Sequence, residues 1–246
     1  MRAAVLSDIH ANLPALESVL GAAEAAGVDE IWCLGDIVGY GADPDACTAL
    51  VRERCDVCLV GNHDLAVLGS LDASTFSDTA AAGVAWTVAN VDEGTLSFLR
   101  GLEPSGEREG IGLFHASPRD PIWEYVLSYD QADAALDSQS QRIGLIGHSH
   151  VQLFFNRPEG RRPESAHGAQ AGQGASLDLG LGKWLVNPGS VGQPRDGDAR
   201  AAWLELDTES LFARFHRTGY DVDRAAAAIL GAGLPQALAD RLRVGR

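Results

Sequence analysis

The sequence predicts an α/β protein in which two β-sheets pack together and helices cover their outer faces. Between residues 2 and 60, apolar strand-like runs alternate with helical stretches, a βαβαβ order typical of a parallel sheet with helices on its faces. After residue 150 the order changes to successive strand-like runs, which predicts an antiparallel second sheet or an extension of the first. The 246 residues contain no internal repeat, and we expect residues 1–246 to form a single domain.

The first half of the chain carries the alternating elements. Strands are predicted at "RAAVLS", "EIWCLG" and "VCLV" because each is a short apolar run. A helix is predicted over residues 12–26, where Asn12 can cap the first turn, and another over 43–54, where Pro44 takes the first position. Residues 65–102 interrupt this order with "DTAAAGVAWTVANV" and "EGTLSFLRGL", which we interpret as a helical, cap-like insertion.

The second half is richer in strands. Short apolar strands are predicted over residues 111–114 and 143–146, with a weak helix over 131–137 between them. The next strands are "VQLFFN", "ASLDLG", "KWLVN", "AAWLELD" and "SLFARFHR", followed by helices over 223–230 and after Pro235. Residues 157–174 are rich in Gly, Pro, Gln and Arg, which predicts a mobile surface loop.

Charge and composition exclude several functions. The formal net charge of −15 argues against stable nucleic-acid binding, which needs clustered Lys and Arg. It is compatible with phosphorylated substrates, because bound metal ions reverse the local field. No apolar run is long enough to cross a membrane, no targeting segment opens the chain, and the four cysteines lack zinc-site spacing. We therefore expect a cytoplasmic protein without membrane partners.

Polar side chains follow five of the predicted strands. Because carboxyl ends of parallel strands share one edge of a sheet, we expect these side chains to converge. Imidazole, carboxylate and amide oxygen together suit first-row divalent metals, and two such ions sharing a carboxylate activate water for attack on phosphorus. A buried hydrogen-bonded network is the alternative, whereas a serine nucleophile lacks its G-x-S-x-G motif. The residues are Asp8, His10, Asp36, Asn62, His63, Asp64, His115, His148 and His150.

These motifs resemble a known family. "DIH" at 8–10, "GDIVG" at 35–39, "GNHD" at 61–64, His115, "GHSH" at 147–150 and "NPGSVGQPR" at 187–195 are similar to the calcineurin-like metallophosphoesterase superfamily, closest to its small bacterial and archaeal phosphodiesterases. The resemblance implies a four-layer α/β/β/α sandwich. It also implies two divalent ions, of Mn, Fe, Ni or Zn with Mn favoured.

The resemblance assigns a role to each polar residue. Asp8, His10 and His150 would hold one ion. Asn62, His115 and His148 would hold the other, and Asp36 would bridge both. His63 would be the general acid, and Asp64 would hydrogen-bond to it, fix its tautomer and raise its pKa. Three adjacent side chains at "GNHD" cannot all aim at one metal pair, which agrees with this division of roles.

The implied activity is hydrolysis of a small phosphoester or nucleotide-like substrate, most simply a phosphodiester, by a metal-bridging hydroxide. A phosphomonoesterase, a protein phosphatase and a non-catalytic scaffold are the alternatives. Gly39 stands where many members have a second Asp, and the "DRG" form of the large protein phosphatases is missing. Two further features could be functional or structural. They are Ser190 or Arg195 near the phosphate, and the 117–125 loop, whose Arg119, Trp123 and Tyr125 would form an aromatic wall or simply pack.

Overall fold

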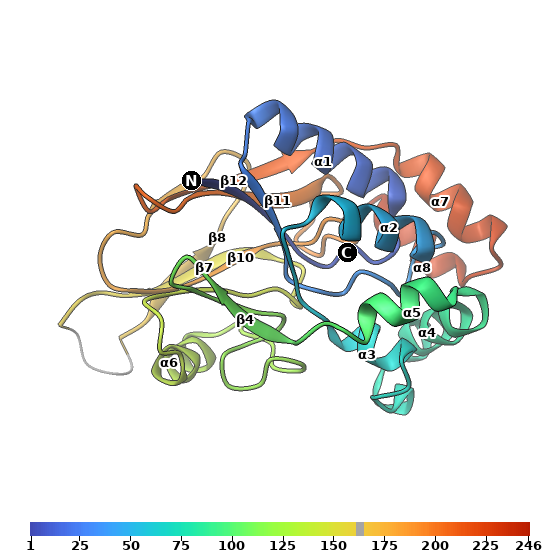
Figure 1. Cartoon of the computed structure of the whole chain (residues 1–246), viewed down its shortest axis with the longest axis horizontal. Helices are drawn as coiled ribbons and strands as arrows, with labels where there is room; N and C mark the ends of the chain where they lie inside the picture. Colours follow the sequence, from blue (N-terminus) through green and yellow to red (C-terminus); the bar gives the residue numbers. More distant parts are fainter. Residues whose placement is uncertain (161–164) are drawn as a thin grey trace.

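The computed structural model describes residues 1–160 and 165–246 (Figure 1). In this part of the chain two six-stranded mixed sheets pack together with helices outside them, which confirms the predicted fold class. The first sheet has the order β3 (Val57–Cys58), β2 (Glu30–Cys33), β1 (Arg2–Leu6), β11 (Ala201–Asp207), β12 (Phe212–Thr218) and β9 (Ser176–Asp178). The second has the order β4 (Ser105–Arg108), β5 (Ile111–Phe114), β6 (Ile143–Leu145), β10 (Lys183–Pro188), β7 (Gln152–Arg157) and β8 (His167–Gln170).

Strand β1 contributes side chains to the hydrophobic cores on both faces of the first sheet. Ala4 and Leu6 pack into the core beneath the helices, whereas Ala3 and Val5 pack into the core between the sheets. This division follows from the alternation of side chains along a strand. Because β1 pairs in parallel with β2 and antiparallel with β11, the first sheet is mixed.

Helices cover both outer faces of the sandwich. On the first sheet lie α1 (Leu13–Ala26) and α2 (Pro44–Arg54), and α7 (Val222–Gly231) and α8 (Gln236–Leu242) pack beside them (Figure 1). On the second sheet lies α6 (Tyr129–Ser138). The Asn12 side chain accepts a hydrogen bond from the backbone N–H of Ala15 and so caps α1 as predicted.

The segment between β3 and β4 is helical, as the sequence predicts. It contains α3 (Asn62–Val67), the short 3₁₀ helix η1 (Ala73–Thr75), α4 (Asp78–Asn90) and α5 (Glu93–Leu99). The two predicted helices correspond to α4 and α5. Helix α3 is an addition, and it begins inside the "GNHD" motif itself.

The strands after residue 150 do not form one antiparallel sheet. Strands β7, β8 and β10 join the second sheet, and β9, β11 and β12 join the first, so the late strands extend both sheets. Strand β8 lies within the predicted 157–174 loop and pairs with β7; residues 161–164 of that loop lie outside the described residues. Edge strands β4 and β8 were missed because their mostly exposed, polar residues show no apolar alternation. No helix in the described ranges is long and apolar enough to span a membrane.

Candidate metal centre

The polar residues that follow the strands meet at one end of the sandwich. Asp8 and Asp36 follow β1 and β2 of the first sheet, whereas His115 follows β5 and His148 and His150 follow β6 of the second. The convergence expected along the edge of one parallel sheet therefore occurs where two sheets end side by side.

The gathered side chains form two groups that share one carboxylate. Asp8, His10, Asp36 and His150 form one group, and Asp36, His115 and His148 form the other, with candidate ligand atoms within 4.8 Å of one another in each. Asn62 joins the second group, because its Oδ1 lies 3.1 Å from His115 Nε2. Each of these seven side chains is at most 3% exposed.

Backbone carbonyls fix the tautomers of three imidazoles. The Nδ1 atoms of His10, His115 and His150 lie 3.1, 3.0 and 2.6 Å from the carbonyl oxygens of Val38, Leu34 and Gln193. A carbonyl oxygen only accepts hydrogen bonds, so each Nδ1 carries the proton and donates. A ring with its proton on Nδ1 turns Nε2 toward the centre of the site, which is the usual arrangement of a metal-binding histidine.

The centre of the site contains acceptors without donors. His10 Nε2 and His150 Nε2 lie 3.1 Å apart, although both present lone pairs. Asp8 Oδ1, Asp36 Oδ2 and His148 Nε2 are buried with no hydrogen-bond partner among the described residues. A hydrogen-bonded polar network would need donors opposite these atoms. Divalent cations satisfy them, so the residues present fit metal ions.

Burial shifts the protonation of the metal-free site toward neutral groups. It raises the pKa of Asp8 to about 7. It also raises the pKa of Asp36 well above its usual value, with a further contribution from the charge of Asp64. For His10, His148 and His150, burial lowers the pKa well below its ordinary value. Neutral imidazoles are ready to bind metal, whereas the two carboxyl groups must first lose protons.

Several of these residues have an unusual backbone conformation. Asp8, His10, Asp36, His148 and His150 have φ angles between 49° and 63°, in the left-handed region that non-glycine residues rarely adopt. Such strain clusters at functional sites, because the surrounding structure must overcome it. The sequence carries no signal for it.

In the "GNHD" motif, Asn62 faces the second ligand group, whereas Asp64 faces the backbone of neighbouring loops. Asp64 Oδ1 accepts hydrogen bonds from the backbone N–H groups of Ile37 and Val38 at 2.9 and 3.0 Å, and Oδ2 accepts from that of Gly61 at 2.9 Å. No hydrogen bond joins Asp64 to His63, whose Nδ1 has no partner among the described residues. The predicted hydrogen bond between Asp64 and His63 is therefore not formed, and the Asp64 carboxylate instead connects the loop after β2 to the start of α3.

His63 is held by ring packing instead. Its ring centroid lies 4.3 Å from that of Tyr40, 4.8 Å from that of His10 and 4.9 Å from that of Phe76. Burial, and secondly the charge of Arg195, lower its pKa well below the ordinary value, opposite to the predicted direction. Gly39, with φ +84°, lies directly against this imidazole, and a Cβ there would sit 2.6 Å from His63 Nδ1.

A pocket of about 340 Å³ opens over the site. Asp36, Asn62 and His148 are among its lining residues, and Phe76 of the insertion also lines it. Trp123 and Tyr125 of the 117–125 loop line it too. Tyr125 packs on His148 at a centroid distance of 4.1 Å, and Trp123 on Phe76 at 5.1 Å. Arg119 instead forms an ion pair with Glu124 at 3.0 Å.

Ser190 and Arg195 of the "NPGSVGQPR" segment, the two candidates for a position near the phosphate, have different surroundings. Ser190 Oγ donates to the backbone carbonyl of Asp8 and accepts from the N–H of Gln193, both at 2.7 Å, so it fixes the turn. Arg195 lines the pocket together with Arg241 of α8. No motif marks Arg241, Tyr40 and Phe76, so the sequence does not predict that these residues line the pocket.

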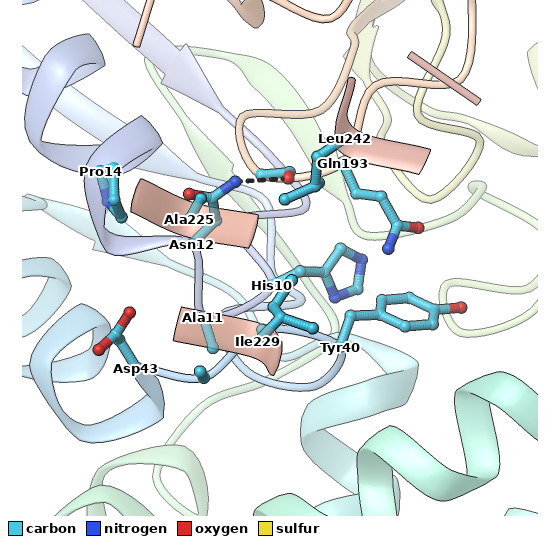
Figure 2. Close-up of a pocket in the computed structure, with 13 residues that line it drawn as sticks. His10, Ala11, Asn12, Pro14, Tyr40, Asp43, Gln193, Ala225, Ile229 and Leu242 are labelled. Atoms are coloured by element: carbon cyan, nitrogen blue, oxygen red, sulfur yellow. Dashed lines mark hydrogen bonds between the residues drawn. The ribbon is translucent and has the colours of Figure 1, made fainter. Parts of the chain in front are cut away.

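A second, much smaller cavity lies behind His10 (Figure 2). It holds about 10 Å³ and is bounded by His10, Tyr40, Ala225 and Ile229 of α7, and Leu242 of α8. This is room for roughly one water molecule. This cavity is therefore too small to admit a substrate.

Comparison with known proteins identifies the family. Residues 1–209 match the model of the calcineurin-like phosphoesterase superfamily domain. The chain belongs to this superfamily. It is 38% identical to an uncharacterized protein of Methanocaldococcus jannaschii, over 99% of this chain and 98% of that protein.

One solved structure supports this assignment, and a second shares the fold. The crystal structure of a metallophosphoesterase from Sphaerobacter thermophilus matches with a TM-score of 0.89 and 36% identity, over 100% of this chain and 99% of that one. A hypothetical protein from Pyrococcus horikoshii shares the fold, with a TM-score of 0.78 and 20% identity, over 100% of this chain and 98% of that one. The family and the buried Asp/His groups support a metal-dependent phosphoester hydrolase.

Proposed function

We propose that this member of the superfamily is a phosphodiesterase that uses two divalent metal ions. The observation that carries the proposal is the pair of buried ligand groups that share Asp36. One ion would be held by Asp8, His10 and His150. The other would be held by Asn62, His115 and His148, and Asp36 would contact both.

When bound, the two ions would supply Lewis-acid charge for the phosphoryl oxygens and an activated water as nucleophile. We favour manganese over iron, nickel and zinc. The carboxylate and amide oxygens of the donor set suit Mn, and its imidazoles suit iron, nickel and zinc as well.

His63 would donate the proton that the leaving oxygen requires. Its ring lines the pocket and is held between Tyr40 and Phe76, so its position is defined without a carboxylate partner. Burial disfavours its protonated form in the ligand-free chain. The negative charge of a bound phosphoester would favour that form and so restore the acid.

The walls of the pocket support a nucleotide-like substrate. Trp123 and Phe76 pack edge to face at 67°, and Tyr125 lies over His148 at 31°. Tyr125 is 40% exposed, so part of its ring remains available to a planar group. Aromatic side chains of this kind stack on nucleobases.

The test is a panel assay of the manganese-loaded chain. Bis(p-nitrophenyl) phosphate represents a diester, and p-nitrophenyl phosphate a monoester. We expect the diester to be hydrolysed with the higher kcat/KM. Hydrolysis of the monoester alone would replace the proposal with a phosphomonoesterase, and hydrolysis of neither would favour the scaffold.

A matched pair of histidine variants controls the panel assay. His150→Gln should abolish turnover, because it removes a proposed ligand. His216→Gln should not, because His216 lies on β12, where it pairs with Glu205 at 3.0 Å.

A further inference from the structure

Two arginines line the active-site pocket without an Asp or Glu partner among the described residues. Arg195 ends the 187–195 segment, and Arg241 lies in α8. Neither forms an ion pair with an Asp or Glu side chain in the part of the chain that the structure describes. The chain has 34 acidic residues and 19 basic ones, so most positive charges have acidic neighbours available. Two neighbouring guanidinium groups without an acidic side chain between them are therefore unusual in so acidic a chain.

Both guanidinium groups lie close to the ring of Tyr40. The Cζ atoms of Arg195 and Arg241 lie 5.8 and 5.9 Å from the centroid of its ring. Arg195 Nη2 donates to Tyr40 Oη at 3.3 Å and to Gln193 Oε1 at 2.9 Å, whereas Arg195 Nε is buried and has no hydrogen-bond partner among the residues that the structure describes. Arg241 Nε donates to the carbonyl oxygen of Arg246 at 2.8 Å. Each guanidinium has five N–H donors, so these contacts leave donors free for a ligand.

The repulsion between the positive charges of Arg195 and Arg241 favours the binding of an anion. Burial, and secondly the charge of Arg195, lower the pKa of Arg241. Two like charges held together in a partly buried place repel unless a negative group lies between them. The forked geometry of arginine matches phosphate, which accepts parallel hydrogen bonds from it.

Arg195 and Arg241 lie on the side of the pocket where the leaving group is expected. Tyr40 packs on the ring of His63, which is the proposed proton donor to the leaving oxygen, at 4.3 Å. Arg195 and Arg241 therefore lie on the His63 side of the pocket. Arg241 also lies beyond residues 1–209, which the family model matches, so the C-terminal helix adds it to the domain.

We propose that Arg195 and Arg241 bind a second phosphate group of the substrate, carried by its leaving group. This rests on the proposed phosphodiesterase function and narrows the substrate class to phosphoesters whose leaving group is itself phosphorylated, such as a nucleotide. The metal ions would take the scissile phosphate, and the arginine pair would take the other one.

Calorimetry with ligands that cannot be hydrolysed tests this independently of turnover. The manganese-loaded chain is titrated with alkyl-bridged bisphosphonates whose bridges have one to three carbon atoms, and with the matching alkyl monophosphonates. We expect the best bisphosphonate to bind at least about 10-fold more tightly than its monophosphonate, because charge-assisted hydrogen bonds are strong. Arg195→Gln and Arg241→Gln should each remove most of this preference, and Arg241→Lys should restore part of it.

Arg243→Gln is the matched control. Arg243 follows α8 two residues after Arg241 and pairs with Asp223 at 2.7 Å, so its loss should leave the preference unchanged. Equal affinity of the native chain for bisphosphonates and monophosphonates would overturn the proposed second phosphate site. An equal loss of affinity for both ligand types in Arg241→Gln would also overturn it. Failure to hydrolyse bis(p-nitrophenyl) phosphate while the preference persists would instead reject the phosphodiesterase function.

Discussion

The Nε2 atoms of His10 and His150 lie 3.1 Å apart, and both rings donate from Nδ1 to a backbone carbonyl. Two lone pairs at this distance repel each other unless a cation lies between or beside them. The fold maintains the contact by holding both residues at positive φ and by burying both rings. The pair therefore marks the first candidate ion position, and Asp36 joins it to the second.

Metal affinity should rise with pH. The pKa of Asp8 in the metal-free chain is about 7, above the ordinary carboxyl value of 3.8, so below pH 7 this group holds a proton that metal must displace. We expect the affinity for Mn²⁺ to rise up to about 10-fold per pH unit between pH 5.5 and 7 for each proton released. Titration calorimetry in buffers of different ionisation enthalpy measures those protons. A constant affinity with no proton release would contradict the assignment of Asp8 as a ligand.

The same shifts determine how the stability of the metal-free chain depends on pH. The folded pKa of Asp8 is raised, so its stabilising contribution is present below pH 3.8 and is lost as the pH rises through about 7. The pKa of His148 is lowered, so its contribution is lost as the pH falls below about 6.5. We therefore expect Mn²⁺ to raise the melting temperature more at pH 7.5 than at pH 5. An equal shift at both pH values would argue against this electrostatic account.

Gly39→Ala should impair turnover while leaving the metal in place. The added Cβ would lie 2.6 Å from His63 Nδ1, so the imidazole must move, and the positive φ adds strain of about 1 kcal/mol. We expect a fall in kcat of roughly 10-fold or more for leaving groups that need protonation. Gly110→Ala is the control, because Gly110 also has a positive φ but nothing lies near its Cβ position. Equal effects of the two variants on kcat would show that strain alone is responsible.

His63→Ala should separate leaving groups by their basicity. Loss of the acid should slow hydrolysis of alkyl esters by roughly 10²–10⁴-fold, and that of nitrophenyl esters much less, because nitrophenolate leaves without a proton. Bound manganese is measured in the same samples and should remain. Equal losses for both ester types would remove the acid role from His63.

Asp64→Ala should reduce stability strongly. Its carboxylate accepts three backbone N–H groups, and each buried donor left unsatisfied costs about 1–3 kcal/mol. We expect urea denaturation to show a loss of about 3 kcal/mol or more in the free energy of unfolding. Asp72→Ala removes an exposed acceptor of one N–H group and should cost at most about 1 kcal/mol. A stable Asp64→Ala variant with an altered pH–rate profile would return Asp64 to an orienting role.

The sequence predicted the fold class and the principal helices because their physical signals are local. Asn12 and Pro44 mark the starts of α1 and α2, and the apolar runs mark β1, β5 and β10. The division of the late strands between two sheets depends on pairing between distant segments, such as β11 with β1, which no local pattern encodes. The polar edge strands β4 and β8 were missed for lack of apolar alternation.

The residues of the candidate site also differ in whether a local sequence pattern predicts them. Its ligand residues follow strands in recognisable motifs, so the sequence alone could assemble them. The hydrogen-bond partners of Asp64 could not be predicted, because the loop after β2 supplies two of the three donors. Arg241 had no signal in the sequence, since only the packing of α8 against Tyr40 and its neighbours brings it to the pocket.

The most direct test of the shared-carboxylate centre is the metal content of the native chain and of Asp36→Asn. Both are loaded with Mn²⁺, desalted and analysed for manganese per chain. The arrangement predicts two ions in the native chain and a loss of both, or of all but a weakly held one, in Asp36→Asn, together with loss of phosphoester hydrolysis. Two ions retained by Asp36→Asn, or none bound by the native chain, would contradict it.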